Sequence, residues 1–285
     1  MLPALCIYTF ALAGPLIFGT IPNSFFSWNL IKGTHNWIGI KNFVDLVHDR
    51  DFIQSMFLSF KLAVVTIVLT NVLAFFIALA LNTHIFGKPV IRAFFFIPNI
   101  ISGVMIALAW TFIFQKVTPI IGELLHSEAV KGFSWFGSST AAFAAVSVVT
   151  VWQGLGFLMI LYITGLQSIP LDVMEAASID GATKWQQIRY VTLPHLRTMI
   201  CILLIMNVGR IFNSDFGLFY TVPLNSGSLY SATQVIDTYV YRVMTATNNI
   251  GMSTAAGLLQ NVVGFICIIS VNKIVQKIDE DSSLF

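Results

Sequence analysis

Polar side chains recur at close spacing inside one of the most apolar parts of the sequence. Asn207, Arg210 and Ser214 follow one another at intervals of three and four residues, and Asn213 and Asp215 flank Ser214. On a helix this spacing places the first three on one side. A buried polar stripe of this kind offers hydrogen bonds to the hydroxyl groups of a ligand, and its guanidinium could also meet a ligand carboxylate. The alternative is that Arg210 pairs with Asp215 or extends toward an aqueous interface.

Aromatic residues add a second kind of chemistry, because the flat face of an aromatic ring can stack on a ring of a ligand. Trp152 and Gln153 are adjacent and place a stacking face beside an amide. The other candidates for the ligand path are Trp110, Phe216, Phe219, Tyr220 and Tyr239. A belt of interfacial aromatics explains Trp110 and the tyrosines equally well. The same reasoning favours an interfacial position for Lys61.

The sequence lacks the patterns of a catalytic centre. It has no GxxxxGK[ST] phosphate loop, no GxGxxG after a strand and no His or Cys cluster at metal-ligand spacing. Cys6, Cys201 and Cys267 lie in apolar runs and are expected to pack rather than to bind metal. We therefore expect a chain that is not an enzyme and holds no cofactor or metal. The net charge of +2 gives no reason to expect nucleic acid.

The elements that must position these residues are membrane-spanning helices. Of 285 residues, 56% are hydrophobic and only 10% are charged, against roughly 25% charged in ordinary soluble domains. Backbone groups in lipid must be paired internally, so the apolar runs predict helices. We expect an all-α membrane protein with six spans in a single domain over 1–285. The expected spans are 2–26 (bent by Pro15), 52–81, 93–115, 140–166, 195–216 and 250–273.

One polar loop, 167–194, interrupts this pattern and contains EAASIDGATKWQQIRYVTLP at 175–194. Pro170 suits the first turn of a helix, and Gly181 is placed as a C-terminal breaker. Thr183 to Gln186 matches a capping box, which predicts a second short helix ending near Pro194. Small alanines beside acidic residues would let another protein approach closely and be recognised by its basic side chains.

The loop resembles the EAA motif of ABC importer permeases, EAA-x3-G-x9-I-x-LP, with Val191 in place of isoleucine. Similar stretches are NWIGIKNFVDL at 36–46, FFFIPNIISGVMIALAWTFIF at 94–114, WQGLGFLMILYITGLQSIP at 152–170 and FGLFYTVPLNSGSLYSATQVIDTYVYRVM at 216–244. The resemblance implies a type I importer transmembrane domain with a cytoplasmic pair of coupling helices. The residues that it assigns to coupling are Glu175, Ala176, Ala177, Asp180, Gly181, Leu193 and Pro194.

The same resemblance implies a topology and a set of partners. Basic residues are too evenly distributed to fix the orientation, whereas the resemblance puts both termini in the cytoplasm and the loop 217–249 outside. It implies a multi-pass subunit of the bacterial inner or plasma membrane. The implied partners are a second, homologous permease, two ATPase subunits that hold ATP and Mg²⁺, and an extracellular or periplasmic solute-binding protein.

The implied substrate is a sugar, in particular an oligosaccharide, which could contain uronate. The ligand path would comprise Trp152, Gln153, Asn207, Arg210, Asn213, Ser214, Asp215, Phe216 and Tyr220. The alternative is an ion-coupled secondary transporter of a small polar solute. Such a transporter is expected to carry internal inverted repeats and ionisable residues near the middle of the membrane. The sequence offers Asp215 alone and no clear repeat.

Overall fold

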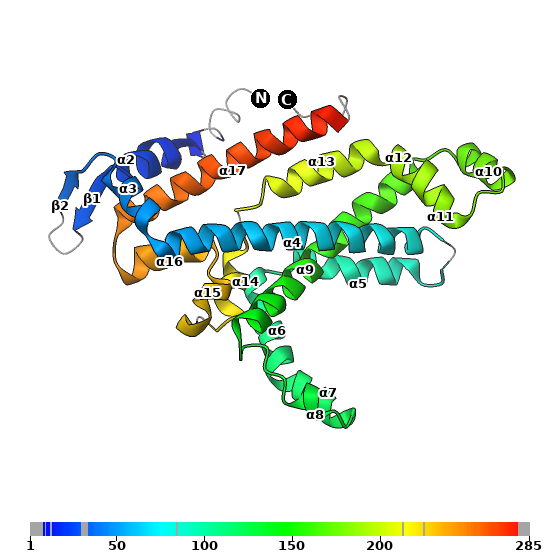
Figure 1. Ribbon diagram of the computed structural model, residues 1–285, viewed down its shortest axis with the longest axis horizontal. Coiled ribbons are helices and arrows are strands. Elements are labelled where there is room, and N and C mark those ends of the chain that lie inside the picture. Colours follow the sequence, from blue (N-terminus) through cyan, green and yellow to red (C-terminus); the bar gives the residue numbers. More distant parts are fainter. Residues whose placement is uncertain are drawn as a thin grey trace.

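Helices make up most of the protein, and the longest of them run along its long axis (Figure 1). The computed structural model describes residues 8–278 apart from positions 9, 12, 30–33, 84, 213 and 225. The body is formed by α4 (Arg50–Leu81), α5 (Lys88–Ile100), α6 (Gly103–Phe112), α9 (Ser139–Gln167), α13 (Arg197–Val208) and α17 (Ile250–Ile278). At the start of α4, the carboxylate of Asp49 accepts hydrogen bonds from two backbone N–H groups and so caps the helix.

Three predicted spans agree closely with α4, α9 and α17. Within the described residues, four helices are long and apolar enough to cross a bilayer: Arg50–Leu81, Gly103–Leu124, Ser139–Gln167 and Ile250–Lys277. The bent pair Lys184–His195 and Arg197–Val208 makes a fifth if it is counted as one span. The first expected span, 2–26, lies partly outside the described residues. The prediction of six spans is therefore not tested as a whole.

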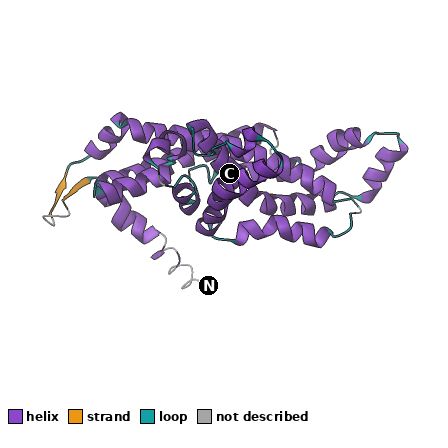
Figure 2. Ribbon diagram, turned by 90° about the horizontal axis from the view of Figure 1, so that it is seen from below, coloured by secondary structure: helices purple, strands orange, loops and turns teal. Residues whose placement is uncertain are grey.

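The expectation of an all-α fold is wrong at one end of the molecule. A π-helical turn (Pro15–Thr20) and α2 (Ile21–Asn23) lead into an antiparallel hairpin of β1 (Phe26–Asn29) and β2 (Thr34–Trp37). Cross-strand ring contacts support the hairpin, with Phe26 and Trp37 5.2 Å apart and Trp28 and His35 5.0 Å apart between centroids. Helix α3 (Lys41–His48) follows it. Figure 2 shows the hairpin projecting from the end opposite to α10 and α11.

The third predicted span, 93–115, is two helices and not one. Helix α5 ends at Ile100, Ile101 and Ser102 are extended, and α6 begins at Gly103. Pro98 inside α5 cannot donate a backbone hydrogen bond, which weakens the helix just before the break. Beyond α6 the chain continues through a π-helical turn (Ile113–Val117) to α7 (Thr118–Leu124) and α8 (Glu128–Lys131). The apolar span is therefore Gly103–Leu124.

The fifth predicted span, 195–216, is also broken. A bend of 66° separates the segment ending at His195 from α13, which itself ends at Val208. Gly209, a poor helix former, begins a turn, and the chain then reaches α14 (Phe216–Thr221). The chain continues as a 3-10 turn (Gly227–Leu229), α15 (Tyr230–Thr233) and α16 (Ile236–Ala246).

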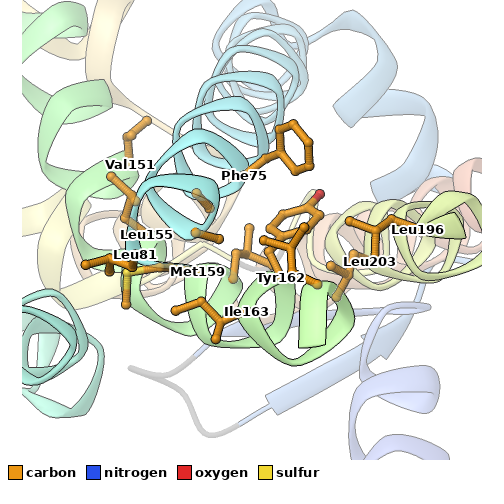
Figure 3. Close-up of a cluster of buried hydrophobic side chains, with 13 residues drawn as sticks. Phe75, Leu81, Val151, Leu155, Met159, Tyr162, Ile163, Leu196 and Leu203 are labelled. Carbon is orange, nitrogen blue, oxygen red and sulfur yellow. The ribbon is translucent and has the colours of Figure 1, made fainter. Parts of the chain in front are cut away.

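The central core lies where α4, α9 and α13 meet (Figure 3). Ala74 and Ala78 of α4 are fully buried, and these small side chains let α9 approach closely. Tyr162 lies among Phe75, Leu203 and their neighbours, and its hydroxyl donates a hydrogen bond of 2.9 Å to Oδ1 of Asn71. This hydrogen bond links α4 to α9 within an otherwise apolar cluster.

Candidate functional site

A polar cavity lies where the chain breaks after α13. Its volume is about 170 Å³. Helices α4 and α9 form one wall, and the end of α13 with the segment that follows forms the other. The polar lining residues are Ser59, Thr66, Thr150, Gln153, Asn207, Arg210, Ser214 and Asp215. A cavity with this lining, enclosed by long apolar helices, is where a hydrophilic solute could be held within the bilayer.

The residues after α13 reach the cavity in a different way from the one predicted. A continuous helical stripe through Asn207, Arg210 and Ser214 is wrong, because the helix ends at Val208. Backbone hydrogen bonds from Arg210 to Asn207 and from Ile211 to Val208 form a turn instead. The turn and the extended residues after it bring Arg210 and Ser214 to the same cavity as Asn207. Asn213 lies outside the described residues.

Asp215 joins three elements at the cavity. Its Oδ1 accepts a hydrogen bond of 3.1 Å from the backbone N–H of Leu218 and so caps α14. Its Oδ2 accepts one of 3.4 Å from Nε2 of Gln153 in α9. The carboxyl group also packs against Gly103 at the start of α6, where any side chain would overlap it. The two broken spans therefore meet at this carboxylate.

A second carboxylate, Asp237 of α16, fixes the wall of the cavity from behind. Its Oδ2 accepts a hydrogen bond of 2.8 Å from the backbone N–H of Ser214, and its Oδ1 accepts one of 2.8 Å from Gln260 of α17. Gln260 also donates to the carbonyl of Phe212. Burial raises the pKa of the Asp237 carboxyl, and the hydrogen bonds from Gln260 and Ser214 oppose that shift. Asp237 and Gln260 were not singled out from the sequence. The position of Gln260 inside an apolar span was a signal that could have identified it.

Helix α16 is tied to α4 as well. Ser59 accepts a hydrogen bond of 2.9 Å from the backbone N–H of Ile236, and Tyr239 donates one of 2.6 Å to Asp49. Burial raises the pKa of Tyr239, and the neighbouring Asp49 carboxylate acts in the same direction. The tyrosine thus stays protonated and able to donate. These contacts hold α16 in place against α4, which also lines the cavity.

Most of the aromatic candidates lie away from the cavity lining. Trp152 packs against Trp110, with ring centroids 5.5 Å apart, and lines a separate apolar groove between α4 and α9. Phe216 and Tyr220 stack on each other at 5.2 Å and contact Tyr241 of α16. Phe219 does line the cavity. Lys61 lies 4.5 Å from the ring of Phe143.

The polar loop forms two short helices, α10 (Leu171–Ile179) and α11 (Lys184–Gln187). The predicted capping box is present, with Thr183 and Gln186 hydrogen-bonded reciprocally. Gly181 has φ of +77°, as a helix-terminating glycine requires. After α11, a π-helical turn (Ile188–Thr192) and α12 (Leu193–His195) place Leu193 and Pro194 at the bend before α13.

Several large apolar side chains are exposed on the surface of this otherwise polar loop. Ile179 is 86% exposed, Trp185 61% and Tyr190 67%. Glu175, Ala176 and Asp180 are exposed beside them, and Ala177 is half-buried. No residue of α10 is buried. Exposed aromatic and aliphatic side chains rimmed by polar groups are typical of a surface for another protein.

The fold and the cavity define a helical membrane protein with a polar site between broken spans. Within the residues that the structure describes, no three His, Cys, Asp or Glu side chains are grouped as metal ligands. The family model for the binding-protein-dependent transport system inner membrane component matches residues 70–280. The chain belongs to this family, whose members work with a separate binding protein. Membership does not favour the ion-coupled alternative.

Several relatives are transporter permeases. The chain is 32% identical over 258 residues to the probable starch degradation products transport system permease protein AmyD of Thermoanaerobacterium thermosulfurigenes, covering 90% of this chain and 85% of the relative. It is 31% identical over 249 residues to the multiple sugar-binding transport system permease protein MsmF of Streptococcus mutans, covering 87% and 84%.

A solved structure supports the fold. It is the crystal structure of a bacterial ABC transporter involved in the import of the acidic polysaccharide alginate. One of its chains aligns with a TM-score of 0.85 at 23% sequence identity, covering 98% of this chain and 94% of that chain. At this identity the match establishes the type I permease fold, and the substrate of this chain is argued separately below.

Proposed function

We propose that the chain is the transmembrane subunit of an ATP-driven importer and forms the translocation path of a sugar, in particular an oligosaccharide. The observation that carries this proposal is the polar cavity at the junction of two broken spans. Its amide, hydroxyl and charged side chains can exchange hydrogen bonds with sugar hydroxyls. Relatives such as AmyD and MsmF, named for starch degradation products and multiple sugars, support the same substrate class.

The α10–α11 loop is the proposed coupling element. Two short capped helices joined at Gly181 are stiff enough to transmit a rigid-body movement from a partner. The exposed Ile179, Trp185 and Tyr190 supply apolar contact area for a docked ATPase subunit. Glu175 and Asp180 supply charges for basic side chains of that subunit, and the small Ala176 lets it approach the backbone. ATP and Mg²⁺ would then be bound by the two ATPase subunits.

The remaining partners follow from the surface and the family. An apolar groove of about 500 Å³ between α4 and α9, lined by residues such as Leu69, Val148 and Trp152, supports packing against a second, homologous permease. The solute-binding protein would dock at the other end, on the hairpin and the 217–249 segment. This arrangement puts the α10–α11 loop and both termini in the cytoplasm.

A charge reversal tests the coupling role. Replacing Glu175 by lysine should abolish ATP-driven sugar uptake in proteoliposomes and release the ATPase subunits during purification, because the substituted charge repels the basic side chains that it now meets. Glu123→Lys is the matched control, since Glu123 is an equally exposed acid on α7, far from this loop. Normal uptake and stimulated ATPase activity in Glu175→Lys would contradict the proposed role.

A further inference from the structure

We propose that Asp215 sets the charge selectivity of the polar cavity, so that the site accepts neutral, hydroxyl-bearing sugar units and rejects those that carry a carboxylate. This inference rests on the proposed sugar transport and extends it by naming the charge class of the substrate. It replaces the expectation that Arg210 meets a substrate carboxylate.

Asp215 lies at the N-terminal end of α6. The N-terminus of this ten-residue helix carries partial positive charge, and its N-cap residue, Ser102, provides no side-chain cap. In transporters with broken spans, such helix ends can bind the anionic group of a substrate. Here the carboxylate of Asp215 lies directly against Gly103, the first residue of α6. A second anion that approached this helix end would therefore come close to the charge of Asp215.

Asp215 also retains hydrogen-bonding capacity. A carboxylate can accept about four hydrogen bonds, and Asp215 receives one from Leu218 and one from Gln153. Arg210, which only donates, lines the same cavity, and within the described residues no ion pair joins it to Asp215. A hydroxyl group can accept from Arg210 and donate to Asp215 at once. A carboxylate can only accept, so it satisfies the first group and is repelled by the second.

A second acid, Asp237, lies behind the residues that line the cavity. Asp237 accepts the backbone N–H of Ser214, which lies next to Asp215, and also the amide of Gln260. A substrate anion entering the cavity would therefore approach two carboxylates and one guanidinium. Coulomb repulsion of this kind is strong where water is largely excluded. Neutral hydroxyls experience no such penalty.

The test compares a neutral and an acidic trisaccharide on the complete complex. The complex with its partner permease and ATPase subunits is reconstituted in nanodiscs without nucleotide or binding protein. Maltotriose and trigalacturonate are then titrated calorimetrically into the wild type, Asp215→Asn and Asp45→Asn. Asp45 is an exposed acid on α3 that does not line this cavity, so its variant makes the same change in charge elsewhere.

We expect the wild type and Asp45→Asn to bind maltotriose at least roughly tenfold more tightly than trigalacturonate, and Asp215→Asn to lose most of that preference. For the wild type, the trimethyl ester of trigalacturonate should bind more tightly than the free acid and approach maltotriose, because esterification removes the charges that Asp215 repels. This second measurement holds even if Asp215→Asn fails to assemble.

Two results would overturn the inference while leaving sugar transport intact. One is a wild type that binds trigalacturonate as tightly as maltotriose or more tightly. The other is a preference that neither Asp215→Asn nor esterification of the acidic sugar changes. Binding of neither sugar to the wild type would instead contradict the proposed sugar function, and the inference would fall with it.

Discussion

Replacing Gly181 by valine should disturb the α10–α11 loop through its backbone alone. Gly181 has φ of +77°, and no atom lies within 4 Å of the position that a Cβ would take. The substitution therefore meets no steric obstacle from neighbours, and its cost is conformational. A left-handed backbone costs a residue with a Cβ roughly 1–2 kcal/mol, and a β-branched side chain lies at the unfavourable end of that range. Asparagine tolerates the conformation far better.

A cost of about 1–2 kcal/mol lowers the population of the present loop conformation by roughly five- to thirtyfold. If this conformation docks the ATPase subunits, their apparent affinity for the permease pair should fall by the same factor. The assay is a titration of ATPase subunits onto permeases in nanodiscs, with uptake measured in parallel. Gly181→Asn is the matched control and should bind almost like the wild type.

Two outcomes would refute this reasoning. Unchanged affinity in Gly181→Val would mean that the left-handed turn between α10 and α11 is not needed for docking. Equal loss in both variants would mean that the side chain itself, and not the backbone angle, disturbs the interface.

Two further predictions concern the helix contacts that hold the cavity walls. Gly156→Ala should destabilise the protein by roughly 1–3 kcal/mol, because its Cβ would overlap the backbone of Phe95 in α5. Gly154→Ala, which meets only an ordinary contact, should be nearly neutral in the same mixed-micelle unfolding assay; equal stability of the two variants would contradict the tight α5–α9 contact. Tyr162→Phe should cost roughly 1 kcal/mol, since it leaves the side-chain oxygen of Asn71 without a donor. A variant as stable as the wild type would show that this hydrogen bond adds nothing to the core.

The spans that sequence reasoning predicted well are those in which apolar composition alone decides the structure. In α4, α9 and α17 nothing interrupts the helix, so each helix follows the length of its apolar run. The loop motif was equally readable, because Gly181 and the Thr183 capping box act through their own backbone. Local chemistry of this kind needs no knowledge of the neighbouring helices.

The breaks in the third and fifth spans could not be predicted in the same way. Ile101 is apolar and would continue a helix by composition, yet it is extended. The close contact of α5 with α9 at Gly156, which lies beside this break, involves residues far apart in the sequence. The hairpin depends on cross-strand ring contacts such as that of Trp28 with His35. Trp152 was a reasonable candidate for the ligand path, but the rotation of α9 turns it toward Trp110 and Gln153 toward the cavity.

The hydrogen bonds of Gln260 have a mechanical consequence, because they couple α17 to the wall of the cavity. Gln260 donates hydrogen bonds to both the carbonyl of Phe212 and the carboxylate of Asp237. Helix α17 therefore cannot tilt without displacing the backbone at Phe212, just before Asp215. A rotation of α17 would therefore be transmitted by the Gln260 side chain to the segment that carries Asp215 and lines the cavity. Binding of a solute in the cavity and its release would then depend on the position of α17.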